Sequence, residues 1–397
     1  MKDIPPEVLD EIISCLPPYD MQSFRNSSLV AKSWIYPSRR RLFEVIDKLQ
    51  DATLRLWLND ASPKNVELLQ HVRSLSIKVN SSHHRPGTLL DFPHRDPPLF
   101  PRLRRLVVQS ASPKSIAQLG VSLASQHTLE YLCLCCCQVT ISTLATIINH
   151  FPNLIHLELL SLFNDVDDKP TPPLSRPLRK LTVDEPDSFD EFGILDQLLE
   201  LRPQCDEVTI SVSPLSAPSL TQRIIDGVDA TVKRLDLNIS TNCEYIAKNL
   251  SSVLLNETLA GLGEPLSLAN CQELCELKVY SWELMETDLI STITSTEIQK
   301  ITLNPLGPLV ETVFTSLGRD YWTQLDSSLR QLIDRAEYKL RLEVEFRFSS
   351  SEKWAGKPLF EEHLPMVHEK ARVSAVDIGD GAVVYCSDRA RESQRKE

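Results

Sequence analysis

The sequence predicts an α/β protein in which a short N-terminal helical module precedes an irregular solenoid built on a parallel sheet. Three observations predict this architecture. The first forty or so residues are patterned for helices. Strand-length stretches then recur at nearly regular intervals, with helix-like segments between them. The composition, with 42% hydrophobic and 24% charged residues in 397, is typical of a core-forming chain of two or three domains.

Residues 1–46 are expected to form a bundle of three short helices. Pro5 and Pro6 suit the start of the first helix, because the N–H groups of a first turn are unpaired and proline has none. The apolar residues of this helix recur at helical spacing: Leu9, Ile12, Ile13 and Leu16. Asp20 can cap the second helix. Pro37 is expected to kink or divide the third.

Residues 70–380 are expected to form a solenoid with a C-terminal cap. Nine strand-length stretches alternate apolar and polar residues, and their central apolar residues are Leu75, Leu106, Leu132, Leu157, Leu181, Val208, Leu235, Leu277 and Ile301. The separations between them are 31, 26, 25, 24, 27, 27, 42 and 24 residues. Most lie near the leucine-rich-repeat period of about 20–29 residues. Because one unit cannot bury its apolar edge alone, stacked units must share a continuous core.

The repeats are degenerate in sequence. The stretch "LEYLCLCCCQV" fits the repeat template, with leucines at relative positions one, four and six and Cys137 at position nine. The other units carry different residues there: Ala111, Leu162, Pro186, Ser240, Trp282 and Leu306. We therefore expect an irregular leucine-rich-repeat-like horseshoe solenoid with a parallel sheet. Residues 47–69 are expected to be a connecting helical segment, and residues 381–397 a charged tail.

The sequence offers no catalytic arrangement. It contains no Gly-x-Ser-x-Gly elbow, phosphate-binding glycine loop or His-Glu-x-x-His motif. Cys133 and Cys136 have the separation seen in zinc knuckles, but the nearest second pair, Cys271 with Cys275, has the wrong spacing and lies several repeats away. On a strand, Cys133 and Cys136 also point to opposite faces. We expect a non-catalytic protein without catalytic residues, metal or cofactor.

Charge and hydropathy restrict the partners and the compartment. The net charge of -12 argues against a nucleic-acid partner, which would need basic patches. The first residues include no apolar signal-peptide core, and no run approaches the roughly 18 apolar residues of a membrane span. We therefore expect a cytoplasmic or nuclear protein, or one found in both, with no membrane partner. Its ten cysteines are expected to remain thiols.

The helical module resembles an F-box. The F-box pattern appears in order here: Ile4 and Pro5 with Glu7, then Val8, Ile12, Leu16 and Pro17, then Asp20 with Met21, Val30 and Trp34. The cysteine or serine that usually follows the valine is replaced by Ala31, Lys32 and Ser33. The motif covers about a tenth of the chain. The overall style resembles F-box proteins of mushroom-forming fungi, whose remaining chain often holds similarly degenerate leucine-rich repeats.

The resemblance implies a substrate receptor of a Skp–cullin–F-box ubiquitin ligase. In that family the F-box docks on a Skp-type adaptor, and through it on a cullin, while the repeats bind a protein substrate. The adaptor-facing set implied by the family pattern is Ile4, Pro5, Leu9, Ile12, Leu16, Pro17, Met21, Leu29, Val30 and Trp34. Some of these side chains must also form the module's own core, where Phe24 and Phe43 are expected. A scaffold that acts outside ubiquitination is the alternative.

Substrate binding is expected on the concave side of the sheet. The strand positions between the core residues point there. These positions are Arg105, Val107 and Gln109; Tyr131, Cys133 and Cys135; His156, Glu158 and Leu160; Lys180, Thr182 and Asp184; Arg234, Asp236 and Asn238; Glu276, Lys278 and Tyr280; Lys300, Thr302 and Asn304. Because aromatic and arginine side chains dominate many interfaces, the candidate substrate-binding residues are Arg105, Tyr131, His156, Arg234 and Tyr280.

Overall fold

The structure is a computed structural model of the chain, and it divides into two compact units. Unit 1 spans Met1–Arg176 and unit 2 spans Pro177–Glu397. The structure describes residues 5–16, 20–30, 32–50, 67, 69–79, 100–123, 127–164, 172–184, 198, 203–212, 217–228, 231–239, 266–281, 285–305, 318–335, 342–348, 362–365, 367, 371–377 and 383–386.

Unit 1 begins with the three helices that the sequence predicts. They are α1 (Pro6–Ser14), α2 (Met21–Val30) and α3 (Lys32–Leu42). Both α1 and α2 pack on α3. Asp20 caps α2 as expected, because its carboxylate accepts hydrogen bonds from the backbone N–H and the hydroxyl of Ser23. These two bonds hold the pKa of Asp20 below its usual value. We call α1–α3 the helical module.

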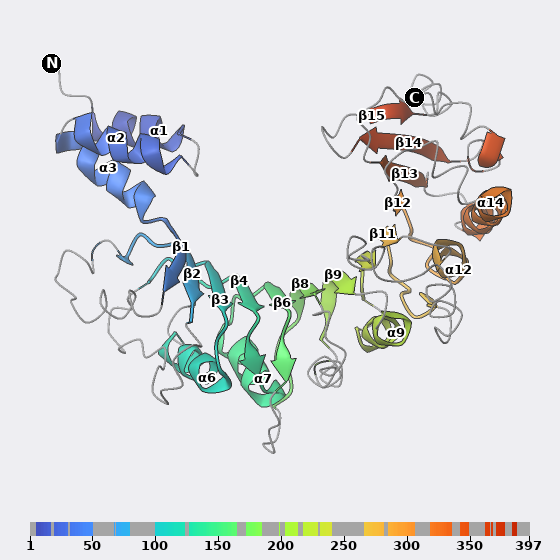
Figure 1. Ribbon diagram of the computed structural model, residues 1–397, viewed down its shortest axis with the longest axis horizontal. Coiled ribbons are helices and arrows are strands. Elements are labelled where there is room, and N and C mark those ends of the chain that lie inside the picture. Colours follow the sequence, from blue (N-terminus) through green and yellow to red (C-terminus); the bar gives the residue numbers. More distant parts are fainter. Residues whose placement is uncertain are drawn as a thin grey trace, which may run out of the picture. The chain divides into compact units, whose positions relative to one another are not determined.

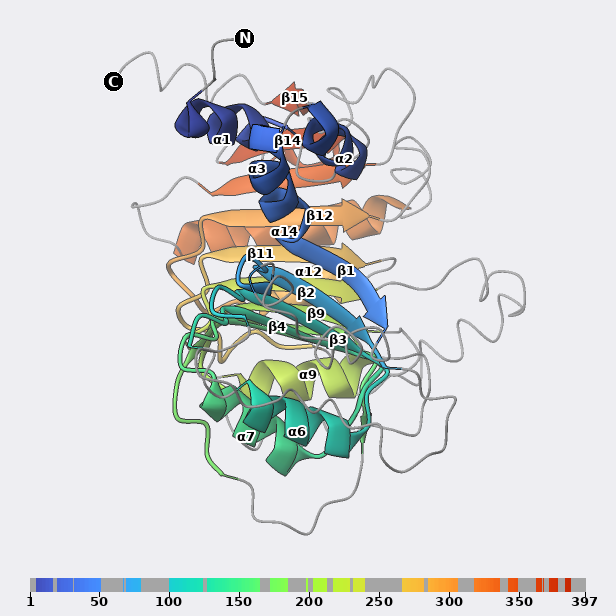
Figure 2. The same cartoon turned by 90° about the vertical axis from the view of Figure 1, so that its left-hand side faces the viewer.

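The sheet of unit 1 is open, and its strands are parallel to their neighbours in the order β1-β2-β3-β4-β6. Their bounds are Val45–Gln50, Ser74–Lys78, Arg105–Gln109, Tyr131–Cys135 and His156–Leu160. Helices α6 (Pro113–Ser122) and α7 (Ile141–His150) lie on one side of this sheet (Figures 1 and 2). Two short parallel strands, β5 (Gln138–Val139) and β7 (Phe163–Asn164), form a second sheet.

Three successive strands of unit 1 are each followed by the same kind of turn. Ser110, Cys136 and Ser161 each follow a strand and have a positive φ of 50–57°. The amide of Ser110 donates to Cys135 O, and the amide of Cys136 donates to Leu160 O. The next residue along, Cys137, is fully buried, and its Sγ lies 3.3 Å from the carbonyl oxygens of both Val108 and Cys135. The thiol thus satisfies backbone groups inside the turn, the function that position nine has in the repeat template.

Within the described residues, unit 2 contributes eight sheet strands, in the order β8 to β15. Seven are parallel to their neighbours, and β15 pairs antiparallel with β14. The strand bounds are Leu178–Asp184, Cys205–Val212, Arg234–Ile239, Glu276–Ser281, Lys300–Pro305, Glu343–Phe348, Arg372–Asp377 and Val383–Cys386. Helices α9 (Ala217–Gly227), α12 (Met285–Ser291) and α14 (Gly318–Arg335) lie on one side of this sheet (Figure 1).

All nine strands predicted from the sequence are present. Their central apolar residues lie opposite one another, Leu75 to Leu157 in unit 1 and Leu181 to Ile301 in unit 2. Each is at most 2% exposed, which places the core between each sheet and its helices. The α/β class and the parallel sheets are therefore confirmed.

Two details differ from the sequence prediction. The first residues of the segment expected to be helical, 47–69, belong to strand β1, and residues 51–66 lie outside the described part. The stretch predicted as a tail contains β15. Helix α3 includes Pro37 and is not divided there. Among the described helices, none is long and apolar enough to cross a membrane.

Candidate protein-binding surfaces

Helix α1 divides its aliphatic residues between a buried and an exposed stripe. Leu9 and Ile13, four residues apart, are each 1% exposed and belong to the module's core. Val8 and Ile12, also four apart, are 42% and 40% exposed. A helix places residues four apart on the same face, so α1 presents a second apolar stripe to solvent. The substrate-receptor interpretation included Ile12 in the adaptor-facing set but not Val8, although its spacing to Ile12 was visible in the sequence.

The C-terminal end of α2 exposes more of its aliphatic side chains than α1 does. Leu29 and Val30 are 83% and 67% exposed, while Phe24 on the same helix is 2% exposed and packs internally as expected. Single exposed aliphatic side chains are common on protein surfaces. Leu29 and Val30, however, are adjacent at a helix end, and Val8 and Ile12 add a second exposed apolar pair on α1. Together they form apolar surface that the helical module does not bury in its own core.

The remaining residues of the predicted adaptor-facing set are placed as follows. Pro5 is exposed just before α1. Leu16 and Trp34 are partly exposed, as is Phe43, which was expected to be internal. Leu9 lies in the core, so it stabilises the module and is not open to a partner in this conformation. Ile4 and Pro17 lie outside the described residues, as does the side chain of Met21.

The second candidate surface is the face of the unit 1 sheet opposite α6 and α7. We call it the unit 1 face. It has three rows, set by the register of β2, β3, β4 and β6. The first row is Ser74, Arg105, Tyr131 and His156; the second is Ser76, Val107, Cys133 and Glu158; the third is Lys78, Gln109, Cys135 and Leu160. No described helix covers this face (Figure 1).

Three predicted substrate-binding residues lie in direct contact in the first row of this face. The guanidinium carbon of Arg105 lies 4.1 Å from the ring centroid of Tyr131, a cation–π contact. Arg105 Nη2 also donates to the Tyr131 hydroxyl at 3.2 Å. The rings of Tyr131 and His156 meet edge to face, with centroids 4.6 Å apart. The structure therefore brings Arg105, Tyr131 and His156 into one strip.

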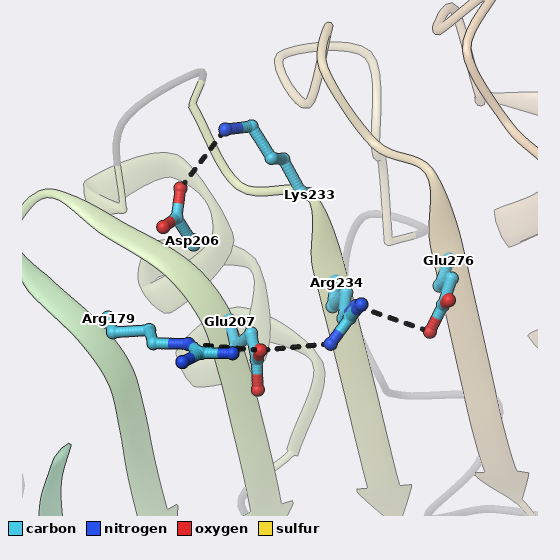
Figure 3. A network of polar contacts seen from close by, with 6 residues as sticks. All are labelled: Arg179, Asp206, Glu207, Lys233, Arg234 and Glu276. Carbon is cyan, nitrogen blue, oxygen red and sulfur yellow. Dashed lines mark hydrogen bonds and ion pairs between the residues drawn. The ribbon is translucent and has the colours of Figure 1, made fainter. Parts of the chain in front are cut away.

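Unit 2 presents a different first row, in which charges alternate in sign. The residues opposite one another are Lys180, Glu207, Arg234, Glu276, Lys300, Glu343 and Arg372. Arg234 lies 3.0 Å from a carboxylate oxygen of Glu207 and 3.4 Å from one of Glu276 (Figure 3). Opposite charges on adjacent strands attract modestly when exposed. We call these seven residues the charge ladder.

The charge ladder changes how Arg234 is interpreted. Its guanidinium lies between two carboxylates of its own sheet (Figure 3), so an acidic partner would have to displace one of them. Tyr280 lies in the third row, opposite Asn238 of β10, four residues along the strand from the Arg234–Glu276 pair. The structure therefore does not bring Arg234 and Tyr280 together. The ladder was missed from the sequence, although the repeat alignment already placed four of its residues at equivalent positions: Lys180, Arg234, Glu276 and Lys300.

The second row of the unit 2 sheet is also less open than expected. Thr302, Glu345 and Ser374 are 0%, 6% and 4% exposed. These residues lie opposite one another on β12, β13 and β14. Thr302 was expected to point to a solvated concave side, and its burial contradicts that expectation. The second row of the unit 1 face also has buried positions, Ser76 and Cys133, but Val107 and Glu158 in it are partly exposed.

The cysteine cluster has the environment of core thiols. Burial raises the pKa of Cys133 to about 11 and that of Cys137 to about 12. Cys136 is exposed and follows the strand, so it does not share a face with Cys133. Within the described part of the chain, no group of three or more His, Cys, Asp or Glu side chains could hold a metal ion.

Thiol alkylation should follow this burial. Cys15 and Cys136 are exposed, whereas Cys133, Cys137, Cys205 and Cys271 are buried thiols whose pKa values are raised to about 11 or 12. A thiol with a raised pKa is almost wholly protonated at pH 7.5, and only the thiolate reacts. We expect iodoacetamide to label Cys15 and Cys136 before these four buried thiols, as read by peptide mass spectrometry. Labelling of Cys137 in the native protein at the rate seen in urea would contradict the packing described here.

Comparison with known proteins leaves the family open. No protein-family model matches the chain, and a search of the curated proteins gives no significant match.

Proposed function

We propose that this protein is a substrate receptor of a Skp–cullin–F-box ubiquitin ligase, in which the helical module docks on a Skp-type adaptor and the repeats bind a protein substrate. The observation that carries the proposal is the apolar surface of the helical module. Leu29 and Val30 are 83% and 67% exposed, and Val8 and Ile12 add a second stripe. The order of F-box-like residues along the same helices agrees with it.

A docking role accounts for this surface physically. A module of about forty residues buries a limited apolar area by itself. Covering exposed aliphatic side chains with a partner removes apolar surface from water, at roughly 25 cal/mol per Å². An amphipathic helix that places such residues in a partner's groove is a common recognition mode. The repeats then remain free to bind a second protein.

Charge substitutions on the module test the proposal. Leu29→Asp and, separately, Ile12→Asp should each weaken binding of the purified chain to a Skp-type adaptor at least tenfold, because a carboxylate would be buried in an apolar interface. Isothermal titration calorimetry measures the affinity. Asn26→Asp adds the same charge on an exposed position of α2 and retains the acceptor for Gln22; it should bind like the wild type.

Two outcomes would count against the proposal. If neither aspartate variant changes the adaptor affinity, the exposed aliphatic residues are not the docking surface. If the wild-type chain has no measurable affinity for the adaptor, the F-box assignment is wrong. Recovery of the adaptor without a cullin from cells would instead favour the scaffold acting outside ubiquitination.

A further inference from the structure

The charge of the chain is divided unequally between its two units. Residues 1–176 contain 19 Lys and Arg against 17 Asp and Glu, whereas residues 177–397 contain 23 against 37. The acidic excess therefore belongs entirely to unit 2. Within unit 1, residues 100–150 hold four basic residues and a single acidic one, Glu130. A local excess of one sign attracts partners of the other sign.

Arg105 is a cation of the unit 1 face that forms no ion pair among the described residues, as is Lys78 in the third row. Its neighbour Arg104 lies 3.6 Å from Glu130, and Arg73 lies 2.7 Å from Glu44. Arg105 is exposed, and within the described residues it forms no ion pair; its contacts are with Tyr131. The matching first-row arginine of unit 2, Arg234, is paired with two carboxylates.

The stacking of Arg105 on Tyr131 prepares it to bind an anion. A guanidinium has five N–H donors, and only one contact to Tyr131 is a hydrogen bond. The ring holds the side chain in place, so less conformational entropy is lost when a ligand binds. The planar edge of a guanidinium matches the two oxygens of a carboxylate.

The rest of the unit 1 face is apolar near Arg105. The partly exposed Val107 follows it in the second row, and Cys133 beside it is 3% exposed. Cys135 and Leu160 continue this surface in the third row, about 13 Å from the first at the rise of a β-strand. Glu158 lies in the second row, on β6. An acidic residue of a ligand is therefore favoured beside Arg105 on β3, and apolar residues beside Cys135 and Leu160. Lys78, at the β2 end of the third row, offers a second positive charge.

We propose that the unit 1 face binds an acidic, partly apolar peptide segment of a partner protein, with Arg105 as its carboxylate-binding residue. The inference rests on the proposed function and deepens it, by giving the chemistry of the segment that the repeats bind. A nucleic acid fits less well, because its affinity depends on many neutralised phosphates. Among the described residues, the unit 1 face offers two cations, Arg105 and Lys78, together with Glu158 and an apolar floor.

The test selects peptides from a random 16-residue display library with the full-length chain. Selected peptides should be enriched in Asp and Glu. By fluorescence polarisation, Arg105→Ala should weaken their binding at least tenfold, as expected for loss of a charged hydrogen bond. Arg234→Ala is the matched control, a first-row arginine whose charge is already neutralised, and should bind like the wild type. Arg105→Glu should regain affinity for a peptide whose acidic residues are replaced by Lys.

Several results would overturn the inference: selection of no peptide, selection without acidic enrichment, or equal affinity in the Arg105→Ala variant. Tighter binding of a 20-nucleotide DNA or RNA than of any selected peptide would also overturn it. The adaptor assay separates this inference from the proposed function. Arg105→Ala should retain adaptor binding, and Leu29→Asp should retain peptide binding. Peptide binding in a chain that has no adaptor affinity would remove the ligase proposal and leave the peptide site.

Discussion

Replacing Trp322 with alanine is expected to destabilise unit 2 by about 3–5 kcal/mol, as loss of a large buried aromatic side chain commonly does. Trp322 lies on α14 and is 1% exposed. Its ring lies 6.3 Å, centroid to centroid, from that of Phe346 on β13 and 6.2 Å from the imidazole of His363. The substitution would leave a cavity between α14 and the sheet. Urea unfolding followed by circular dichroism should show a lower midpoint for unit 2.

The neighbouring residue Gln324 supplies the control for this prediction. It lies on the same helix and is exposed, so Gln324→Ala should change the free energy of unfolding by less than about 0.5 kcal/mol. If Trp322→Ala were no more destabilising than Gln324→Ala, then α14 would not pack on the sheet as described.

Replacing Lys300 with methionine is expected to destabilise unit 2 by about 3 kcal/mol, since breaking a largely buried ion pair leaves a carboxylate without its cation. Lys300 Nζ lies 2.5 Å from Oε2 of Glu345, whose side chain is only 8% exposed. The double variant Lys300→Met with Glu345→Leu should recover part of this loss, because it removes both charges. Urea unfolding of the two single variants, the double variant and the wild type completes a double-mutant cycle.

Lys233 provides a matched control for the same chemistry in solvent. It pairs with Asp206 at 3.3 Å, but both side chains are about half exposed. Lys233→Met should therefore cost less than about 1 kcal/mol. If Lys300→Met and Lys233→Met lowered the free energy of unfolding equally, the burial of Glu345 would not be what makes the Lys300–Glu345 ion pair stabilising.

Much of the fold could be predicted because its signal is local. In the stretches around Leu106 and Leu132, apolar residues alternate with polar ones, and this period of two belongs to a strand whatever surrounds it. Asp20 likewise predicts the start of α2, because aspartate is a preferred N-cap residue and Asp20 directly precedes the helix. The same reasoning failed for β1 and β15. Each is a short strand, Val45–Gln50 and Val383–Cys386, placed beside stretches with helical or charged character.

The candidate sites were only partly accessible from the sequence. The register assigns Arg105, Tyr131 and His156 to one row, and the repeat spacing predicted this. That Arg105 stacks on Tyr131, while Arg234 is held by Glu207 and Glu276, depends on side-chain contacts between residues about 26–42 positions apart. On α1, the helical period identified the aliphatic residues but not that Leu9 lies inside while Ile12 remains exposed.

The sequence by itself determined where most of the described strands and the three N-terminal helices lie, and which strand positions share a face. Those features follow from the side-chain periods of two residues in a strand and 3.6 in a helix, which can be recognised within a short stretch of sequence. The tertiary structure alone decided which of these faces is chemically available. Packing of α1 and α2 on α3 selects the aliphatic side chains that stay exposed. Register between neighbouring strands places opposite charges side by side in the first row of unit 2, whereas Arg105 in unit 1 has no ion pair among the described residues.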